Sequence, residues 1–173
     1  WARRVVVVDS GSDDDTEGIC KTYANVAFLT HAFVTHAEQW NWALNNTAVT
    51  TRWVLALDAD YCVGDELLAE VRSLDPAVDG VVGYRVPFKY RQSGRVLRGS
   101  LYPSVVALFA RESSVYCQDG HTQRLRVDGD VGQLTAFIVH DDRKSLQRWL
   151  TSQDRYAELE CAHLLSTPMS KLS

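Results

Sequence analysis

Residues 53–60 read Trp-Val-Leu-Ala-Leu-Asp-Ala-Asp, an apolar run that ends in two aspartates one residue apart. A short apolar run of this kind predicts a buried strand, and open α/β sheets bind ligands at the carboxyl ends of their strands. Asp58 and Asp60 are therefore expected where a ligand binds. Two such carboxylates suit a hard divalent cation, Mg²⁺ or Mn²⁺, which in turn neutralises a diphosphate. A solvated loop with a capping aspartate is the alternative interpretation.

A second polar cluster follows the apolar run Val5 to Val8, which predicts a fully buried parallel strand. The cluster reads Asp9-Ser10-Gly11-Ser12-Asp13, and we expect it at the same edge of the sheet as the first. The carboxylate of Asp9 can accept hydrogen bonds from a nucleoside base or from ribose hydroxyls. A loop that caps the following helix explains the cluster equally well, since Asp14 to Thr16 suit a helix N-terminus.

Strands and helices alternate through the first half of the chain. We expect a helix to about Ala24, a strand over 26–29, a helix over 36–48, the strand over 53–57, and a helix from Asp65 that stops at Asp75-Pro76. Alternation of this kind is typical of a mostly parallel central sheet flanked by helices. The predicted fold class is therefore α/β.

The second half is predicted as extended segments separated by turn residues. We expect strands over 81–86, 105–109 and 134–139, a turn at 92–94, and a hairpin with its tip at Asp128-Gly129. A helix follows from about Lys144, with apolar residues roughly on one face: Leu146, Trp149, Leu150, Tyr156, Leu159 and Leu164. Three tryptophans, Trp40, Trp53 and Trp149, occupy positions expected to be core. No linker intervenes, so we expect one domain over 1–173, with halves 1–75 and 76–173.

Size, charge and cysteine content narrow the function classes. The 173 residues, 46% apolar and 23% charged, are typical of one globular domain with a sizeable core. A net charge of -4 argues against a nucleic-acid partner, which needs a concentrated basic face. The four cysteines form no CxxC pair, so reduced cytosolic thiols are the simplest interpretation. No run of eighteen apolar residues occurs, so we expect no membrane span.

Three stretches carry a resemblance to a known family. Residues 7–16 (Val-Val-Asp-Ser-Gly-Ser-Asp-Asp-Asp-Thr), 37–44 (Ala-Glu-Gln-Trp-Asn-Trp-Ala-Leu) and 53–60 resemble the family 2 glycosyltransferases in motif, order and spacing. Within that family the chain is most similar to bacterial enzymes of lipopolysaccharide-core or cell-envelope glycan assembly. The resemblance implies a Rossmann-like GT-A fold and transfer of a sugar from a nucleotide-sugar donor to a glycan or lipid-linked glycan acceptor.

The same resemblance implies roles for residues in the first half. Asp9 would lie near the nucleoside, and Asp58 and Asp60 would form the metal and diphosphate motif, with Asp60 as the direct ligand. Many members have a second acidic residue where Ser10 stands, so the nucleotide stays open. The family's usual first strand would precede Trp1, so we expect the chain to be N-terminally incomplete. We expect a cytoplasmic protein, with peripheral contact at the inner face of the membrane and the oligomeric state left open.

The second half contains further candidates for chemistry, of which the resemblance points to Asp119 and His140. Related enzymes place a catalytic carboxylate within 118–124; many have a Glu after the His, where this chain has Thr122. Asp119 is therefore the candidate general base for an inverting displacement, or else a turn residue. His140 resembles the family's distal His that completes the metal shell, with helix capping as the alternative. Arg143 and its neighbour Lys144 would face phosphate groups, or form a solvated helix turn.

Two other functions compete with this interpretation. An Asp-x-Asp triplet after an apolar strand also occurs in haloacid-dehalogenase-like phosphohydrolases, but their motif continues with Gly and Thr or Val, whereas Tyr61 and Cys62 follow here. A binding module that keeps the scaffold without turnover is the non-catalytic alternative. His31, His36 and His163 occur singly, without metal-ligand spacing, and we expect no chemical role for them.

Overall fold

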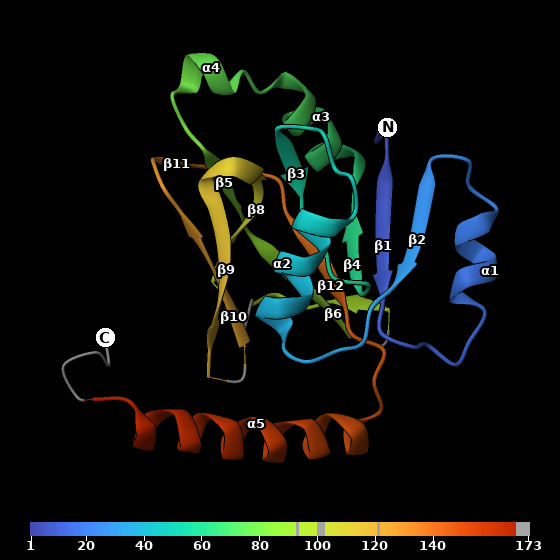
Figure 1. The fold of residues 1–173 in the computed structure, drawn as a ribbon, viewed down its shortest axis with the longest axis vertical. Coiled ribbons are helices and arrows are strands. Elements are labelled where there is room, and N and C mark those ends of the chain that lie inside the picture. The colour runs from blue at the N-terminus through green and yellow to red at the C-terminus, as the bar shows by residue number, and fades with distance from the viewer. Residues whose placement is uncertain (93, 100–102, 121, 169–173) are drawn as a thin grey trace. The chain divides into compact units, whose positions relative to one another are not determined.

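A computed structural model describes residues 1–92, 94–99, 103–120 and 122–168 and contains helices and strands in mixed order (Figure 1). The chain forms two compact units. The first contains residues 1–50 and 116–124, and the second contains residues 51–115 and 125–173. The α/β class is confirmed. The single domain over 1–173 stays a prediction.

The first unit contains a two-stranded parallel sheet. Strand β1 (Val5–Asp9) pairs with β2 (Val26–Thr30) from Val5 opposite Val26 to Asp9 opposite Thr30, and the two lie side by side with α1 (Thr16–Lys21) next to β2 (Figure 1). Consecutive valines favour the extended backbone. The predicted strand and its parallel partner are confirmed, but the expected full burial is wrong: Val5 is 37% exposed and the rest of β1 is half-buried.

Helix α2 (His36–Asn46) is held against the segment that begins at Tyr116. The helix begins after Thr35, whose hydroxyl accepts from the Glu38 N–H at 3.2 Å and so caps one free donor. The Asn41 side chain donates to the Tyr116 carbonyl at 2.8 Å and accepts from its N–H at 3.0 Å. Trp40 stacks on the Tyr116 ring with centroids 5.4 Å apart. The predicted helix is confirmed, ending two residues early.

One sheet of the second unit has the strand order β11-β5-β8-β3. Its members are β3 (Trp53–Leu55), β5 (Gly83–Val86), β8 (Val105–Ala110) and β11 (Val131–Gln133). Strand β8 runs antiparallel to both β3 and β5, whereas β11 is parallel to β5. Its inner side chains supply much of the core, in which Val86 and Phe109 are fully buried.

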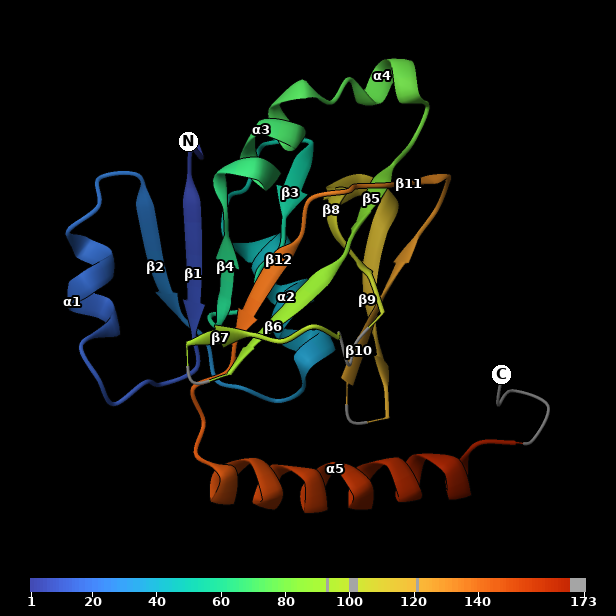
Figure 2. The same cartoon turned by 180° about the vertical axis from the view of Figure 1, so that it is seen from behind.

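The other sheet has the order β4-β12-β6-β7, with β12 between β4 and β6 (Figure 2). Its members are β4 (Tyr61–Val63), β6 (Phe88–Gln92), β7 (Arg95–Val96) and β12 (Ile138–Asp141). Strand β12 is antiparallel to β4 and parallel to β6. The expected mostly parallel central sheet is therefore wrong, because the described strands form separate sheets of mixed direction. The short connection between β6 and β7 explains one antiparallel pair, since it leaves no room for a crossover.

Two connections differ from expectation. Strand β9 (Ser114–Asp119) pairs with β10 (Thr122–Val127), and Gly120, at φ 56°, lies between them. The predicted hairpin at Asp128-Gly129 is wrong, because β10 and β11 belong to different sheets and the chain only bends there. The 3₁₀ turn η1 (Arg111–Ser113) precedes β9.

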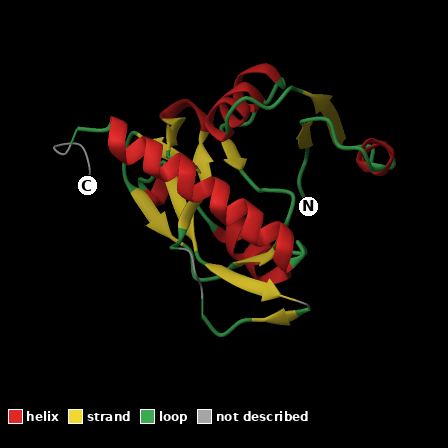
Figure 3. Cartoon of the chain, turned by 90° about the horizontal axis from the view of Figure 1, so that it is seen from below, coloured by secondary structure: helices red, strands yellow, loops and turns green. Residues whose placement is uncertain are grey.

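Three helices complete the second unit. Helix α3 (Asp65–Ser73) buries Leu67 and ends before Asp75-Pro76, as predicted. Helix α4 (Pro76–Asp79), which the sequence did not predict, begins at that proline. Helix α5 (Leu146–Ser166) is one unbroken element (Figure 3) and has no buried residue. The expectation that Trp149 is core is wrong, since it is 42% exposed. Among the described residues, no helix is long and apolar enough to cross a membrane.

Candidate functional site

Strands β4 and β12 bring Asp60 and His140 together. Asp60 directly precedes β4, and the antiparallel register places His140 opposite Tyr61. The Asp141 N–H donates to the Asp60 carbonyl at 2.9 Å, so the ladder continues one residue past the strand. Asp58 lies just before, where its carbonyl accepts from the Tyr61 N–H at 3.0 Å and closes a turn. Backbone pairing therefore determines where Asp60 lies relative to His140.

The two side chains contact each other directly. Nε2 of His140 lies 3.0 Å from Oδ2 of Asp60, and the side chains are 16% and 34% exposed. The imidazole is held between two rings, with centroids 5.3 Å from that of Tyr61 and 4.7 Å from that of Tyr90. Tyr90 stands opposite His140 on β6, so the neighbouring strands on both sides supply this packing. The orientation of His140 is thus restricted by its neighbours as well as by Asp60.

Lys144 adds a positive charge to this pair. Its Nζ lies 3.8 Å from Oδ2 of Asp60 and 3.5 Å from Oδ1 of Asp142. Burial raises the pKa of the Asp60 carboxyl, but the hydrogen bond and charge of His140 and the charge of Lys144 outweigh it, so that the pKa is lowered. Asp60 is therefore a carboxylate at neutral pH, as a metal ligand must be.

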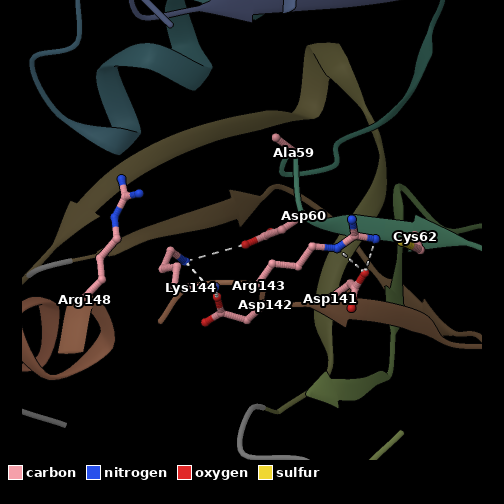
Figure 4. A pocket seen from close by; sticks show the side chains of 8 residues that line it. All are labelled: Ala59, Asp60, Cys62, Asp141, Asp142, Arg143, Lys144 and Arg148. Carbon is pink, nitrogen blue, oxygen red and sulfur yellow. Dashed lines mark hydrogen bonds and ion pairs between the residues drawn. The ribbon is translucent and has the colours of Figure 1, made fainter. Parts of the chain in front are cut away.

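A pocket of about 560 Å³ opens beside Asp60 (Figure 4). Its lining is rich in charge and comes from the loop before β4, from β4, from the end of β12, from the segment that follows it, and from the first turn of α5: Ala59, Asp60, Cys62, Asp141, Asp142, Arg143, Lys144 and Arg148. In Figure 4 Lys144 points to Asp60, while Arg143 turns to Asp141.

Arg143 forms an ion pair with the buried carboxylate of Asp141. Its Nε and Nη2 donate to Oδ2 of Asp141 at 2.9 and 2.8 Å, and this hydrogen bond and charge raise the pKa of the guanidinium. The Asp141 side chain is only 9% exposed, and Arg91 adds a further cation 3.9 Å away. Of the two basic residues singled out in the sequence, it is Lys144 that contacts Asp60.

The donor set fits a divalent cation as two of its ligands. His140 Nε2 and Asp60 Oδ2 lie 3.0 Å apart, a hydrogen-bond distance, so one cation could reach both donors. Among the described residues, no group of three or more His, Cys, Asp or Glu side chains could hold a metal. The remaining positions would therefore be filled by water and by phosphate oxygens, as is usual for Mg²⁺.

The sequence profile described as glycosyl transferase family 2 matches residues 2–132. The chain belongs to glycosyl transferase family 2. It is thus a glycosyltransferase, and its family implies a nucleotide-sugar donor and a GT-A fold. Asp9, Asp58, Asp60 and Asp119 lie within the matched residues, whereas His140 and Arg143 lie beyond them.

In this family 2 glycosyltransferase Asp9 organises its own loop. One carboxylate oxygen, Oδ2, accepts from the N–H groups of Gly11 at 2.7 Å and Ser12 at 2.9 Å, and Oδ1 accepts from the Ser12 hydroxyl. These bonds, that from the Ser12 hydroxyl first, lower the pKa of Asp9. Gly11 adopts φ 96°, a conformation that suits glycine. Contact between Asp9 and a nucleoside stays a prediction.

Asp119 ends β9 and is paired with a cation. Its Oδ2 lies 2.6 Å from Nη2 of Arg124, and its side chain is 34% exposed. Its neighbour Gln118 accepts from the Ala37 N–H at 3.3 Å and donates to the Gly120 carbonyl at 3.0 Å, which anchors the strand end. His121 of the same segment lies outside the described residues. The glycosyltransferase thus carries Asp9 and Asp119 in its first unit, and Asp58, Asp60, His140 and Arg143 in its second.

Sequence reasoning missed the residues that support this site. Tyr61 and Tyr90 flank His140, and Arg148 lines the pocket, but none of them belongs to a motif. Tyr90 could have been found only by knowing that β6 pairs with β12. The only local signal for Arg148 is its place in the first turn of a helix that follows the His140 segment.

Proposed function

We propose that this glycosyltransferase is a metal-dependent, inverting enzyme that transfers a sugar from a nucleotide-sugar to a cell-envelope glycan or lipopolysaccharide acceptor. The observation that carries the proposal is the contact between Asp60 and His140 at 3.0 Å, with Lys144 beside it in a charged pocket. A carboxylate and an imidazole that meet in this way suit a divalent cation, and nearby cations suit phosphate.

Each side chain has a distinct role in the proposed reaction. Asp60 and His140 would hold the cation, with Asp58 beside them in the diphosphate motif, and the bound cation would stabilise the charge of the leaving diphosphate. Lys144 and Arg148 attract phosphate oxygens, and Arg143, which lines the same pocket, neutralises Asp141. Asp9 orders the loop that contacts the nucleoside.

Asp119 is the proposed general base. Its carboxylate takes the proton from the acceptor hydroxyl as that oxygen attacks the anomeric carbon, and the bond from that carbon to the diphosphate breaks. The attack comes from the face opposite the leaving group, so the configuration at the anomeric carbon inverts. Arg124 Nη2, 2.6 Å from Oδ2 of Asp119, holds the carboxylate in place.

The acceptor and the place of action rest on the resemblance to cell-envelope enzymes. A cytoplasmic enzyme at the inner face of the membrane would meet both a nucleotide-sugar and a lipid-linked glycan. Transfer should be assayed with the full chain, Mn²⁺, a panel of nucleotide-sugars and short glycan acceptors, with the anomeric configuration of the product determined by NMR. A product with retained configuration, or full transfer in the presence of EDTA, would overturn the proposal.

Two alternatives give different results in that assay. Phosphate release from phosphomonoesters without sugar transfer would favour the phosphohydrolase, against which the family match already argues. Nucleotide binding without transfer or hydrolysis, in the full chain, would favour a binding module.

A further inference from the structure

A cluster of positive charge lies in β6 and β7 and has no role in the function proposed above. Residues 80–111 contain six Lys or Arg and no Asp or Glu, although the whole chain has a net charge of -4. Four of the six belong to the antiparallel pair β6 and β7 or follow it closely, and together they are called the basic hairpin: Lys89, Arg91, Arg95 and Arg98. Clustered charge of one sign in a chain of the opposite net charge favours an anionic partner.

Strand β6 directs two of these cations to the outer face of its sheet. Phe88 and Tyr90 are buried, at 7% and 8% exposed, whereas Lys89 is exposed and the Arg91 side chain is 34% exposed. Alternate side chains of a strand point to opposite faces, so Lys89 and Arg91 lie on the face turned away from the core. Nζ of Lys89 lies 3.5 Å from the centre of the Phe137 ring, which stabilises its position on that face.

This outer face is continuous with the pocket beside Asp60. Strand β6 pairs with β12 so that Arg91 stands opposite Asp141, and Nη1 of Arg91 lies 3.9 Å from its Oδ2. Asp141 and Arg143 both line the pocket (Figure 4). The cations of β6 therefore lie next to the pocket, on the side of β12 away from β4 (Figure 2).

The basic hairpin has more positive charge than its neighbours neutralise. The carboxylate of Asp141 is shared between two guanidinium groups, since Nη2 of Arg143 also lies 2.8 Å from its Oδ2. Within the part of the chain that the structure describes, no carboxylate forms an ion pair with Lys89, Arg95 or Arg98. These cations are therefore available to an anion.

The position of the hairpin favours the acceptor over the donor as the source of that anion. The strand order β4-β12-β6-β7 puts β6 two strands and β7 three strands away from β4, which begins after Asp60. Because neighbouring strands are about 4.8 Å apart, β6 and β7 lie about 10 Å and about 14 Å from β4. A diphosphate bound beside Asp60 does not extend across these strands, so the hairpin needs a second source of phosphate.

An anionic membrane is the competing partner for such a cluster. Helix α5 argues against it, because between Leu146 and Ser166 the helix contains two arginines against three acidic residues. Amphipathic helices that bind anionic membranes carry a polar face rich in Lys and Arg. The observations therefore favour a phosphorylated glycan.

We propose that the acceptor carries phosphate groups and that the basic hairpin binds them while the acceptor hydroxyl lies in the pocket. Ammonium and guanidinium groups bind phosphate oxygens through charge-assisted hydrogen bonds. The inference rests on the proposed sugar transfer and narrows its acceptor to a phosphorylated glycan.

The first test compares one glycan with and without phosphate. Phosphorylated pentamannose and pentamannose are titrated by calorimetry into the full chain, with Mn²⁺ and a nucleoside diphosphate at saturation so that the donor site is filled. Wild type should bind the phosphorylated form at least about tenfold more tightly, as expected for hydrogen bonds between charged groups. The double variant Lys89→Gln with Arg98→Gln should reduce this ratio to near one. Arg72→Gln with Arg155→Gln, at two exposed arginines outside the hairpin, should keep it.

Transfer kinetics give a second readout, which a merely structural role would not change. Phosphatase treatment of the acceptor found in the transfer assay should raise KM at least about tenfold and leave kcat unchanged, because the hairpin binds phosphate without contact to the reacting atoms. The Lys89 and Arg98 double variant should show the same KM for the treated and the untreated acceptor.

The outcomes separate this inference from the proposed function. A wild-type chain that binds no nucleoside diphosphate and transfers no sugar contradicts the proposed function itself. Equal affinities of wild type for the two pentamannoses, or a KM that dephosphorylation leaves unchanged, contradict only the role of the basic hairpin. Binding to phosphatidylglycerol vesicles without any preference for the phosphorylated glycan also contradicts it and assigns the hairpin to a membrane. Circular dichroism shows whether each variant is folded, and Arg98→Gln alone, at an exposed position after β7, replaces a double variant that is not.

Discussion

Nε2 of His140 lies 3.0 Å from Oδ2 of Asp60, although the two residues are 80 positions apart in the sequence. The contact is held by the pairing of β12 with β4 and by the tyrosine rings that flank the imidazole. A pair fixed by backbone hydrogen bonds and ring packing keeps its geometry with little loss of side-chain entropy on binding. In the proposed function, this pair supplies two ligands of the divalent cation.

Replacement of His140 should weaken the response to metal. We expect His140→Ala to raise the Mn²⁺ concentration for half-maximal transfer at least about tenfold, because one of two protein ligands of the cation is lost. The measurement is a Mn²⁺ titration of sugar transfer at saturating donor. His36→Ala, at an exposed histidine outside the site, is the matched control. An unchanged titration midpoint for His140→Ala would rule out His140 as a ligand.

Replacement of Asp119 should separate chemistry from binding. We expect Asp119→Asn to lower kcat by about 10² to 10⁴, the usual contribution of a general base, and to leave nucleotide affinity unchanged. Transfer kinetics and calorimetry check the two parts. Arg124→Gln breaks the ion pair but keeps the carboxylate, so transfer should fall far less. Equal losses of transfer activity in the two variants would indicate that the ion pair between Asp119 and Arg124 only stabilises the pairing of β9 with β10.

Glu70 should make stability depend on pH. Its carboxylate accepts from Thr135 and Ala136, through bonds of 2.8 to 3.2 Å that join α3 to the loop after β11. Burial raises the pKa of Glu70, but these hydrogen bonds outweigh it and lower the pKa below its ordinary value of 4.5. The unfolded chain therefore takes up the proton first as the pH falls, and the stabilisation present above pH 4.5 is lost below it.

Glu70→Gln should thus destabilise the protein by about 1 kcal/mol at pH 7, after allowance for solvent screening, and by much less at pH 3.5, about one unit below the ordinary pKa. Urea unfolding at the two pH values measures the difference. Glu158→Gln, on the exposed surface of α5, should show no such difference. A Glu70→Gln effect that is equal at both pH values would contradict the account.

Two leucines should differ sharply in their contribution to stability. Leu67 is 1% exposed and belongs to the core, so Leu67→Ala should cost about 2–5 kcal/mol. Leu146 of α5 is 72% exposed, so Leu146→Ala should change the free energy of unfolding by less than about 0.5 kcal/mol. Chemical denaturation of both variants checks the pair. A loss above about 2 kcal/mol for Leu146→Ala would show that α5 is packed in solution.

Local patterns predicted much of the fold. The run of valines predicted β1, and the helical spacing of Ala37, Trp40 and Leu44 predicted α2. The sheet pairing could not be predicted in this way, because it depends on which distant strands meet. Strand β4 is only three residues long, too short for a periodic signal. Because β4 could not be predicted, the sequence could not show that an antiparallel pair of strands, β4 and β12, forms the site.

Asp60 and His140 were expected to lie close together, but the structure brings them together for a different reason. The sequence argument placed both at the carboxyl ends of parallel strands, whereas β4, which begins after Asp60, is antiparallel to β12. The periodicity of α5 was also correct, but periodicity indicates an apolar face and not whether anything covers it. For the same reason Arg91 could not be linked to Asp141 from the sequence, since the two meet only after β6 has paired with β12.

The central claim is that Asp60 and His140 hold the cation that accompanies the donor. The most direct measurement is the Mn²⁺ affinity of the full chain in the presence of a bound nucleoside diphosphate, by electron paramagnetic resonance, for wild type and Asp60→Asn. The amide keeps the size of the side chain and removes its charge, and Glu17→Gln, in an exposed ion pair on α1, is the matched control. The account predicts that Asp60→Asn loses at least about a hundredfold in Mn²⁺ affinity while Glu17→Gln is unchanged; wild-type affinity in folded Asp60→Asn would contradict it.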